Sequence, residues 1–509
     1  MGVRLRSLLL SAVLVAVGCG GDFRPPALET TGVPASELGQ VVDVEVRLET
    51  FRLPGSTLAG LEMEIRFEFE ETGFGKLPAR VFFGPARYDW TRTEVDVEDL
   101  GNGRTTVFVT DDRWTTGTLG PLRIDDTLFE IVLDGDPSPG GRHVSGTAWD
   151  SLNGPGGTFE GWQRHRFLVV GTDFFSGAGH VSEVALVKES EIVVRNRLEL
   201  VSSDAVLRVG SGAAFAVNRF TFDNVQRLDP LSGFSTAWQA GVGGGANPHD
   251  VAVLSDRKAY ATRYEPPFND VAVFDPVLGR LQASIPLEGL AENPDGTPRP
   301  DRMRLAEGAL FVGLQDIDRT FSRFAEGKLA VIDTATDEVV GSIPLGGTNP
   351  GAIDLLRGAD DRLRLYVALA GIFPGLQEQE LSGGVAVVDV TQRALERHAL
   401  DDDVAGGNIG ALAMVSETLG YVVVSDENFA NRVLAFDPAA ATVRRTVLES
   451  PDFVPEIEVD GGGVLAVPDR SFFEPGLCLY RVPDSPEGQE MLIGCGALDV
   501  PPFSIEALD

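Results

Sequence analysis

Short apolar runs separated by polar turns occupy the chain from about residue 165 to its end. In residues 328–350, KLAVIDTATDEVVGSIPLGGTNP, two apolar runs flank a polar turn, and the stretch stops at Gly-Gly-Thr-Asn-Pro. Runs of this length, bounded by Gly, Pro and Asp, are typical of β-strands. Beyond the N-terminus we find no apolar spacing of 3.6 residues, and the 59 Gly and 31 Pro favour many short strands and turns. The sequence therefore predicts an all-β fold.

The same order of strands recurs along the chain. In each unit an apolar strand follows a Pro or Gly, a second strand starts with an aromatic or aliphatic residue, a third ends in Asp-Pro or Asp-Thr, and a fourth follows a short turn. The second strands read RFLVVGTDF, AFAVNRF, AYATRYE, LFVGLQD, LYVALAG, YVVVSDE and VLAVPDR. The third strands read VALVKES, VQRLDPL, VAVFDPV, LAVIDTA, VAVVDVT, VLAFDPA and LYRVPDS. Four-stranded units of roughly 40 to 55 residues are typical of propeller blades, so the sequence predicts a seven-bladed β-propeller over residues 165–509.

These units resemble the YVTN-type repeats of bacterial surface β-propellers. The best copies are AYATRYE with DVAVFDPVLGRLQASIPL, and LFVGLQD with LAVIDTATDEVVGSIPL. Not every unit follows the pattern: Lys188, for example, stands where the third strand of most other units has Asp. The resemblance covers residues 165–509 and implies a propeller fold; it implies no particular chemistry.

The two ends of the propeller are expected to meet. A blade cannot cover both faces of its own sheet, so successive blades stack around an axis and the first must contact the last. The final residues, PPFSIEALD, read like the first strand of a unit with nothing after it, whereas the unit that begins RFLVVGTDF lacks a first strand. We therefore expect Phe503 to Leu508 to form the innermost strand of the blade that starts at Phe167. The alternative is a loose C-terminal tail.

Residues 41–160 alternate charged and apolar positions without the repeat, as in VVDVEVRLETFRL and AGLEMEIRFEFEE. Such strands have one wet face and one packed face. We expect a separate antiparallel β-sandwich of ordinary domain size before the propeller. Its simplest role is that of a spacer or an accessory binding domain.

The N-terminal residues differ from the rest. Two arginines precede the apolar run SLLLSAVLVAVG, which is too short to span a bilayer comfortably and is typical of an export signal. The segment AVGC resembles the lipobox of bacterial lipoproteins, which implies a signal peptide over residues 1–18, a lipid on Cys19 and a flexible tether over residues 19–40. Because Gly20 rather than Asp follows, the resemblance implies the outer membrane, with the protein facing the periplasm or the outside. A plain secretory signal with an incidental cysteine is the alternative.

The other two cysteines, Cys478 and Cys495, flank LYRVPDSPEGQEMLIG, in which DSPEGQ is a turn between strand-like flanks. An antiparallel hairpin would place the two residues opposite each other. We therefore expect a disulfide, which is consistent with an oxidising compartment. A pair of small buried thiols is the alternative.

Charge narrows the choice of partners. The chain has a formal net charge of −34, and such a surface repels phosphate backbones. Nucleic acid is therefore not an expected partner, and solubility alone accounts for the acidity.

The sequence has no local motif for catalysis or for metal binding. HExxH, GxSxG, CxxC, a Walker loop, an EF-hand loop and a GxGxxG turn are missing. Propeller topology nevertheless places the start of each first strand and the end of each second strand on one face. The polar residues expected on that rim are Asp173, Asn218, Arg219, His249, Asp250, Arg263, Glu265, Asp301, Arg302, Asp316, Asp426, Asn428, Asp469 and Arg470. Carboxylate, guanidinium and imidazole groups around an axial cavity suit a small ligand, a peptide or a glycan, and His249 and Arg263 are the leading candidates. The alternative for each residue is that it caps a strand end or bridges two blades.

Two functions remain open. The first is a monomeric, lipid-anchored envelope protein that binds a protein, peptide or glycan through this rim, with no cofactor. The second is a propeller enzyme, either a calcium-dependent lactonase-like hydrolase or a quinone-dependent dehydrogenase. Calcium needs several oxygen ligands at once, and Asp250, Asp316, Asp426 and Asp469 are the residues we expect to supply them.

Overall fold

The structure is a computed structural model of the whole chain. It describes the backbone of ten strands between residues 41 and 163, and residues 165–508 apart from 174–175, 188–189, 211 and 374–377. The predicted signal peptide, tether and lipidated Cys19 lie outside the described residues. The chain divides into two compact units, of which the larger comprises Arg166–Leu186 and Ser190–Leu508.

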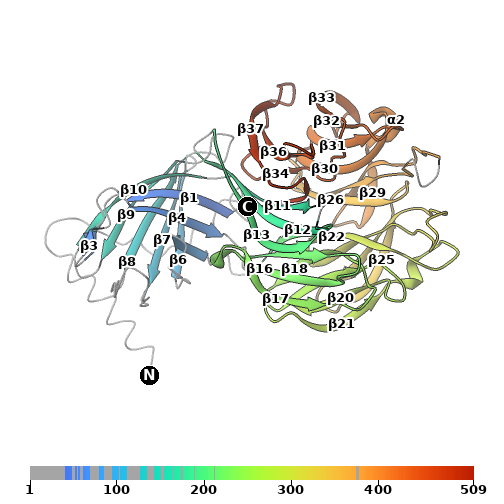
Figure 1. Cartoon of the computed structure of the whole chain (residues 1–509), viewed down its shortest axis with the longest axis horizontal. Helices are drawn as coiled ribbons and strands as arrows, with labels where there is room; N and C mark the ends of the chain where they lie inside the picture. The colour runs from blue at the N-terminus through green and yellow to red at the C-terminus, as the bar shows by residue number, and fades with distance from the viewer. Residues whose placement is uncertain are drawn as a thin grey trace. The chain divides into compact units, whose positions relative to one another are not determined.

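The smaller unit contains one eight-stranded antiparallel sheet in the order β5-β4-β1-β10-β9-β8-β7-β6 (Figure 1). Its strands are β1 (Val41–Leu48), β4 (Leu61–Glu68), β5 (Arg80–Gly84), β6 (Glu94–Gly101), β7 (Arg104–Asp111), β8 (Thr127–Asp134), β9 (His143–Asp150) and β10 (Gly154–Gln163). A separate pair is formed by β2 (Arg52–Leu53) and β3 (Ser56–Thr57). The alternating sequence thus forms antiparallel strands, and the second layer that a sandwich needs stays a prediction.

The larger unit is a seven-bladed β-propeller of four-stranded sheets arranged around a common centre (Figure 1), which confirms the predicted fold. From the inside outwards, blade 1 is β38 (Pro502–Ala507), β11 (His165–Asp173), β12 (Ala178–Val187) and β13 (Glu191–Ser202), and blade 2 is β14 (Val206–Gly210), β15 (Ala213–Asn218), β16 (Asn224–Asp229) and β17 (Ser235–Gly241). Blade 3 is β18 (Pro248–Ser255), β19 (Lys258–Arg263), β20 (Asp270–Asp275) and β21 (Arg280–Pro286), and blade 4 is β22 (Pro300–Ala306), β23 (Ala309–Leu314), β24 (Lys328–Asp333) and β25 (Glu338–Pro344).

The remaining blades follow the same order. Blade 5 is β26 (Pro350–Arg357), β27 (Leu363–Leu369), β28 (Gly384–Asp389) and β29 (Ala394–Asp401), and blade 6 is β30 (Asn408–Ser416), β31 (Leu419–Ser425), β32 (Asn431–Asp437) and β33 (Thr442–Ser450). Blade 7 is β34 (Glu458–Val459), β35 (Val464–Asp469), β36 (Gly476–Arg481) and β37 (Met491–Ala497). The described residues also contain the short helix α2 (Asp402–Ala405) and the 3-10 turns η2 (Pro230–Ser232) and η3 (Glu288–Leu290), and no described helix is long and apolar enough to cross a bilayer.

Apolar side chains between neighbouring blades form the core. Seven hydrophobic clusters occur in the described residues, and each joins two adjacent blades. Successive residues of β11 show how: Phe167 and Val169 belong to the cluster shared with blade 7, whereas Leu168 and Val170 belong to the cluster shared with blade 2. Because side chains alternate between the faces of a strand, the continuous apolar runs of the second strands are buried on both sides.

The Asp that ends most third strands holds the turn to the fourth strand. Asp275 Oδ1 accepts hydrogen bonds from the backbone N–H groups of Val277 and Leu278, at 2.9 and 2.8 Å. Asp333 makes the corresponding bonds in blade 4. An Asp side chain that bonds to the backbone just ahead of it is a recurrent turn-forming device. The Asp at the end of the third strand, which recurs most regularly in the repeat, therefore has a structural role.

The C-terminal strand closes the ring. β38 pairs with β11 in the register Phe167 with Ala507 and Val169 with Ile505, and the end of the chain lies beside β11 in Figure 1. This confirms the prediction that the last residues complete the blade that starts at Phe167.

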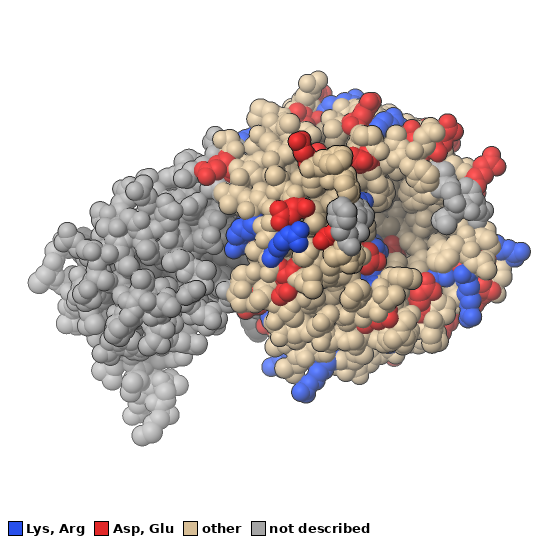
Figure 2. Space-filling model, in the orientation of Figure 1, with Lys and Arg blue, Asp and Glu red and all other residues tan. Residues whose placement is uncertain are grey.

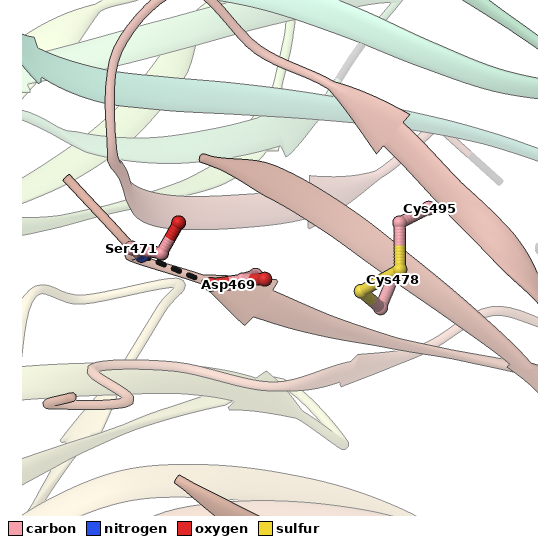
Figure 3. Close-up of a disulfide and its surroundings, with 4 residues drawn as sticks. All are labelled: Asp469, Ser471, Cys478 and Cys495. Carbon is pink, nitrogen blue, oxygen red and sulfur yellow. Dashed lines mark hydrogen bonds between the residues drawn. A yellow bond between two sulfur atoms is a disulfide. The ribbon is translucent and has the colours of Figure 1, made fainter. Parts of the chain in front are cut away.

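The predicted disulfide is also confirmed. Cys478 on β36 and Cys495 on β37 are paired in register and joined through their sulfurs (Figure 3). The bond therefore links the two outer strands of blade 7.

Ring closure can be tested through Ile505, which is fully buried in the cluster between blades 7 and 1. We expect Ile505→Ala to lower the free energy of unfolding by about 2–5 kcal/mol, because it removes buried methyl groups and leaves a cavity. Urea denaturation would measure this. The control Leu278→Ala, at a turn residue that is 56% exposed, should stay within about 0.5 kcal/mol of the wild type. Unchanged thermal stability after truncation at Pro501 would contradict closure by β38.

Candidate functional site: the mouth of the propeller channel

The seven innermost strands contact one another in a closed circle around the axis. Four of them start with a proline that pairs with a residue at or near the end of the second strand of the same blade: Pro248 with Arg263, Pro300 with Leu314, Pro350 with Leu369, and Pro502 with Gly171. First-strand starts and second-strand ends therefore share one face, as predicted. We call the opening of the channel on this face the mouth. The space-filling view shows a hollow near the centre of the propeller, with charged side chains of both signs at its edge (Figure 2).

The innermost strands of blades 3, 4 and 5 each contain a bulge at the mouth. The register shifts between Pro248 and Val251, and at the same place in β22 and β26. A bulge re-aims side chains and is frequent next to functional sites. The residues that form the bulges are His249 and Asp250, Asp301 and Arg302, and Gly351 and Ala352. Blades 3 and 4 thus carry polar groups, whereas a Cβ added to Gly351 of blade 5 would meet nothing within 4 Å. One side of the mouth is polar and the other is open.

His249 is held from two directions. Its Nδ1 lies 2.8 Å from Asp301 Oδ1, and its ring stacks on Tyr264 with the centroids 3.9 Å apart and the planes 3° from parallel. Gln315 completes the network: its Nε2 donates to Asp301 Oδ2 at 3.1 Å, and its Oε1 accepts from the Tyr264 hydroxyl at 2.6 Å. The imidazole is therefore fixed in orientation by groups from blades 3 and 4.

The protonation of His249 follows from its surroundings. Burial, together with the nearby guanidiniums of Arg219 and Arg302, lowers the pKa of His249 below its usual 6.5, so the ring is neutral at neutral pH. Burial opposes ionisation of Asp301, but the hydrogen bond from His249 and the two arginines hold the pKa of this carboxyl below its usual value. The ring proton then sits on Nδ1 and is donated to Asp301. Nε2 keeps its lone pair and has no hydrogen-bond partner among the described residues. A carboxylate that orients a histidine in this way is the arrangement of a general base.

Two arginines flank the imidazole. Arg219 donates from Nε to the carbonyl of Asp204 at 2.8 Å and lies over the Phe503 ring, 5.5 Å from its centroid. Burial and repulsion from Arg302 lower the pKa of Arg219. Arg302 has only a long contact to Glu456, 3.8 Å between Nη2 and Oε1, and in the described part of the chain its buried Nη1 has no hydrogen-bond partner. The mouth therefore holds a buried guanidinium N–H, at Nη1 of Arg302, that has no hydrogen-bond partner among the described residues.

A carboxylate cluster lies next to the mouth, around Arg208 of β14. Arg208 donates from Nε to Asp250 at 2.6 Å and from Nη1 to Glu506 at 3.2 Å, and Glu456 is 3.7 Å away. Asp250 also accepts from the Met303 backbone at 2.6 Å. Burial, and then the neighbouring Glu456 and Asp250, raise the pKa of Glu506 to about 7 although Arg208 opposes this. Asp250 therefore ties blades 2, 3 and 4 together rather than facing a ligand.

Other predicted rim residues are engaged away from the imidazole. Arg263, one of the two leading candidates, lies inside blade 3: its Nε and Nη2 donate to Asp270 at 2.6 and 2.5 Å, and its guanidinium covers the Phe268 ring. Glu265 pairs with Arg299 at 2.7 Å. Arg470 lies over Phe503, 5.8 Å from the ring centroid, and so belongs to the edge of the mouth.

The four carboxylates expected to bind calcium have separate partners. Asp316 accepts from the backbone of Glu292 and Asn293, Asp426 from Asn428 and Ala430, and Asp469 from Ser471 at 2.9 Å (Figure 3). The fourth, Asp250, is held as described above. Within the described residues no group of three or more His, Cys, Asp or Glu is placed to hold a metal ion. The structure does not bring these four together.

The sequence predicted His249, Asp301, Arg219 and Arg302 for the rim, and the structure brings them together. It did not predict their neighbours Tyr264, Gln315 and Glu456. A usable signal was present: the residue after a proline that opens an innermost strand lies at the mouth. The residues in that position are His249, Asp301, Gly351 and Phe503, and Glu456 follows Pro455 just before β34. No comparable signal marks Tyr264 or Gln315, whose roles depend on stacking and hydrogen bonding between two blades.

The chain matches no protein-family model and no curated protein. Its fold is similar to that of a Bacteroides uniformis ATCC 8492 propeller described as a candidate 6-phosphogluconolactonase, at 15% identity and a TM-score of 0.50, with 68% of this chain and 99% of that chain covered. A protein of Bacteroides fragilis NCTC 9343 with the same description gives 14% identity, a TM-score of 0.49, and coverage of 68% and 98%. Hydrazine synthase of Kuenenia stuttgartiensis gives 13% identity and a TM-score of 0.36, with 58% and 91% covered. At these identities the likeness shows the fold alone.

The carboxylate cluster predicts a pH dependence of stability. The pKa of Glu506 is about 7 in the fold against 4.5 for an ordinary glutamate, so between these values the native state binds more protons than the unfolded state. The contribution of Glu506 is therefore greatest below pH 4.5 and is lost as the pH rises through about 7. We expect Glu506→Gln to gain stability relative to the wild type on going from pH 5 to pH 8, as measured by urea denaturation. The exposed control Glu338→Gln should show no such trend, and a parallel pH dependence of Glu506→Gln and wild type would contradict the assignment.

Proposed function

We propose that the propeller binds a small organic anion at the mouth, with its carboxylate between Arg302 and Arg219. The observation that supports this most directly is the buried Nη1 of Arg302, which lacks a hydrogen-bond partner among the described residues. A buried donor without a partner is costly, and a guanidinium is well suited to bind a carboxylate through paired hydrogen bonds. A carboxylate would also relieve the repulsion between the two arginines.

The surroundings of the two arginines suit such a ligand. His249 is neutral, and its Nε2 accepts a hydrogen bond from a hydroxyl group or a water. Gly351 leaves open space on the opposite side, and Gly410 has only the edge of Phe373 within 4 Å of a Cβ position. The mouth can therefore hold the body of a ligand beyond its anionic group.

The N-terminal sequence supports a location in the cell envelope. In this proposal a lipid on Cys19 anchors a monomeric protein to the outer membrane, and the propeller captures its ligand in the envelope. A protein, peptide or glycan partner remains compatible with this arrangement when it presents an anionic group to the mouth.

Loss of Arg302 should weaken binding. We expect Arg302→Gln to reduce the affinity for a six-carbon carboxylate about 10- to 100-fold, the usual loss for a hydrogen-bonded charge partner. Isothermal titration calorimetry with gluconate and hexanoate, one polar and one apolar, would measure this. The control is Arg304→Gln, because Arg304 is on the same strand but pairs with Asp354 at 3.8 Å. Equal affinities of wild type and Arg302→Gln for both anions would refute the proposal.

Hydrolysis of a lactone is a second candidate function, favoured by the pairing of Asp301 with His249. Nε2 would take a proton from a water molecule while the water oxygen attacks the lactone carbonyl, and an arginine would stabilise the oxyanion. The ring C–O bond then breaks, the leaving oxygen takes up the proton, and the product is a hydroxy acid whose carboxylate suits the same arginines. The description of the Bacteroides uniformis propeller makes gluconolactone a reasonable first substrate.

For this second function, His249→Gln should lower kcat/KM for lactone hydrolysis by about 100-fold or more, since it removes the base. Wild-type activity should fall as the pH drops through the pKa of His249, which lies below 6.5, because protonation consumes the lone pair. The matched control is His398→Gln, since His398 is held on β29 by the Leu345 carbonyl at 2.8 Å. Hydrolysis at the uncatalysed rate by the wild type would leave binding as the only function of the mouth.

A further inference from the structure

Phenylalanine recurs at one place in every blade. Each of the seven connections from the second to the third strand contains at least one: Phe174, Phe220, Phe268, Phe321, Phe373, Phe429 and Phe472. Phe174 lies outside the described residues. Because second strands end on the face of the mouth, these connections surround it. A ring of aromatic residues there is not required by the repeat, whose cores lie between the blades.

The exposed phenylalanines are confined to this face in the described part of the chain. They are Phe220, Phe222, Phe429, Phe453, Phe472 and Phe473, with exposed fractions from 49% to 90%. Five follow second strands, and Phe453 lies in the segment that enters blade 7. The exposed large apolar residues elsewhere on the described propeller are Val, Leu and Met. Exposed aromatic groups gathered on one face of a protein commonly mark a binding surface.

Ring contacts occur in two groups within this set and beside it. Phe472 and Phe473 meet edge to face, with centroids 5.2 Å apart. The guanidinium of Arg470 lies 5.9 Å from the ring centroid of Phe453 and 5.8 Å from that of Phe503. The guanidinium of Arg219 lies 5.5 Å from the same Phe503 centroid. We call the phenylalanines on the mouth face of blades 7, 1 and 2 the phenylalanine arc: Phe453, Phe472, Phe473, Phe503, Phe220 and Phe222. Within the arc, Phe503 contacts both Arg470 and Arg219, and so connects it to the mouth.

The chemistry of the arc selects among ligands. Phenyl rings offer apolar area but no hydrogen-bond donor or acceptor, so they suit an alkyl chain better than a peptide backbone or a sugar. The net charge of −34 disfavours a polyanion, but it does not prevent a single carboxylate from reaching a guanidinium at short range. A chain that left the mouth beside Arg219 would pass directly onto Phe503.

We propose that the phenylalanine arc binds the alkyl chain of a fatty-acid-type carboxylate whose head group occupies the mouth. This inference rests on the proposed function and specifies its ligand class: an amphiphilic monocarboxylate rather than a polar sugar acid. Each methylene that leaves water for the arc adds to the affinity, whereas the head group fixes the end of the chain.

The first test is the dependence of affinity on chain length. We expect decanoate, below its micellar concentration, to bind about 10- to 100-fold more tightly than hexanoate, and gluconate to bind most weakly, because four added methylenes are buried. The Phe472→Ser/Phe473→Ser double variant should lose about tenfold in decanoate affinity and keep its gluconate affinity. The matched control is Val277→Ser/Leu278→Ser, two exposed apolar residues in the β20–β21 turn on the opposite face; it should bind like the wild type.

The outcomes separate this inference from the proposed function. If Arg302→Gln weakens gluconate and decanoate alike while the phenylalanine double variant changes neither, the mouth binds anions and the inference is wrong. If the phenylalanine double variant weakens decanoate binding but Arg302→Gln leaves it unchanged, the head group is not at the mouth, and the inference is again wrong. Binding to phosphatidylcholine vesicles that the double variant loses, with no binding of monomeric decanoate, would overturn it in favour of a membrane contact.

Discussion

The pairing of β38 with β11 is the interaction on which the rest of the structure depends. Every blade buries both faces of its sheet only because it has a neighbour on each side, and a ring supplies two neighbours only when it is closed. Closure also positions the groups of the mouth, because the mouth is assembled from several blades. Arg302 comes from blade 4, its contact Glu456 precedes blade 7, and Glu456 accepts from Ser504 on the closing strand at 2.7 Å. An open array would keep the strands and lose this arrangement.

The bulges in the innermost strands bring polar side chains together at the mouth of the channel. A regular strand at the axis would alternate its side chains between the two neighbouring blades, and the polar residues would then enter the apolar clusters. The extra residue in β18 and β22 instead lets His249 and Asp301 meet across two blades, while Asp250 turns toward Arg208 and the backbone of Met303. The backbone hydrogen bonds lost at a bulge are thus replaced by side-chain contacts that tie the blades together.

The fold was predictable because its signals are local and repeated. Asp275 and Asp333 mark turns within a few residues of themselves, and the apolar runs of the second strands need no partner to be recognised. The closing strand followed from the incomplete units at the two ends of the repeat, and the disulfide from two cysteines that flank a turn. The site was only partly predictable, since topology gave the face on which the polar residues lie but not which of them contact one another. His249 and Asp301 are 52 residues apart in the sequence. Arg263 was expected to face a ligand, but it is buried against Asp270 of the same blade. Distances between blades depend on register shifts of one residue, which composition and periodicity do not reveal.

Electrostatics is compatible with the anion binding that we propose, although the chain as a whole is acidic. A charge of −34 repels anions at long range, but at physiological ionic strength this repulsion is screened beyond about 8 Å. Attraction must therefore come from groups in direct contact with the ligand, and these are partly desolvated guanidiniums, for which a hydrogen-bonded carboxylate is worth most. A ligand with many charges would meet the repulsive surface at several points and the arginines at only one. In this proposal the acidic surface favours a ligand with one anionic group over a ligand with several. Any further affinity of that ligand must then come from its uncharged part.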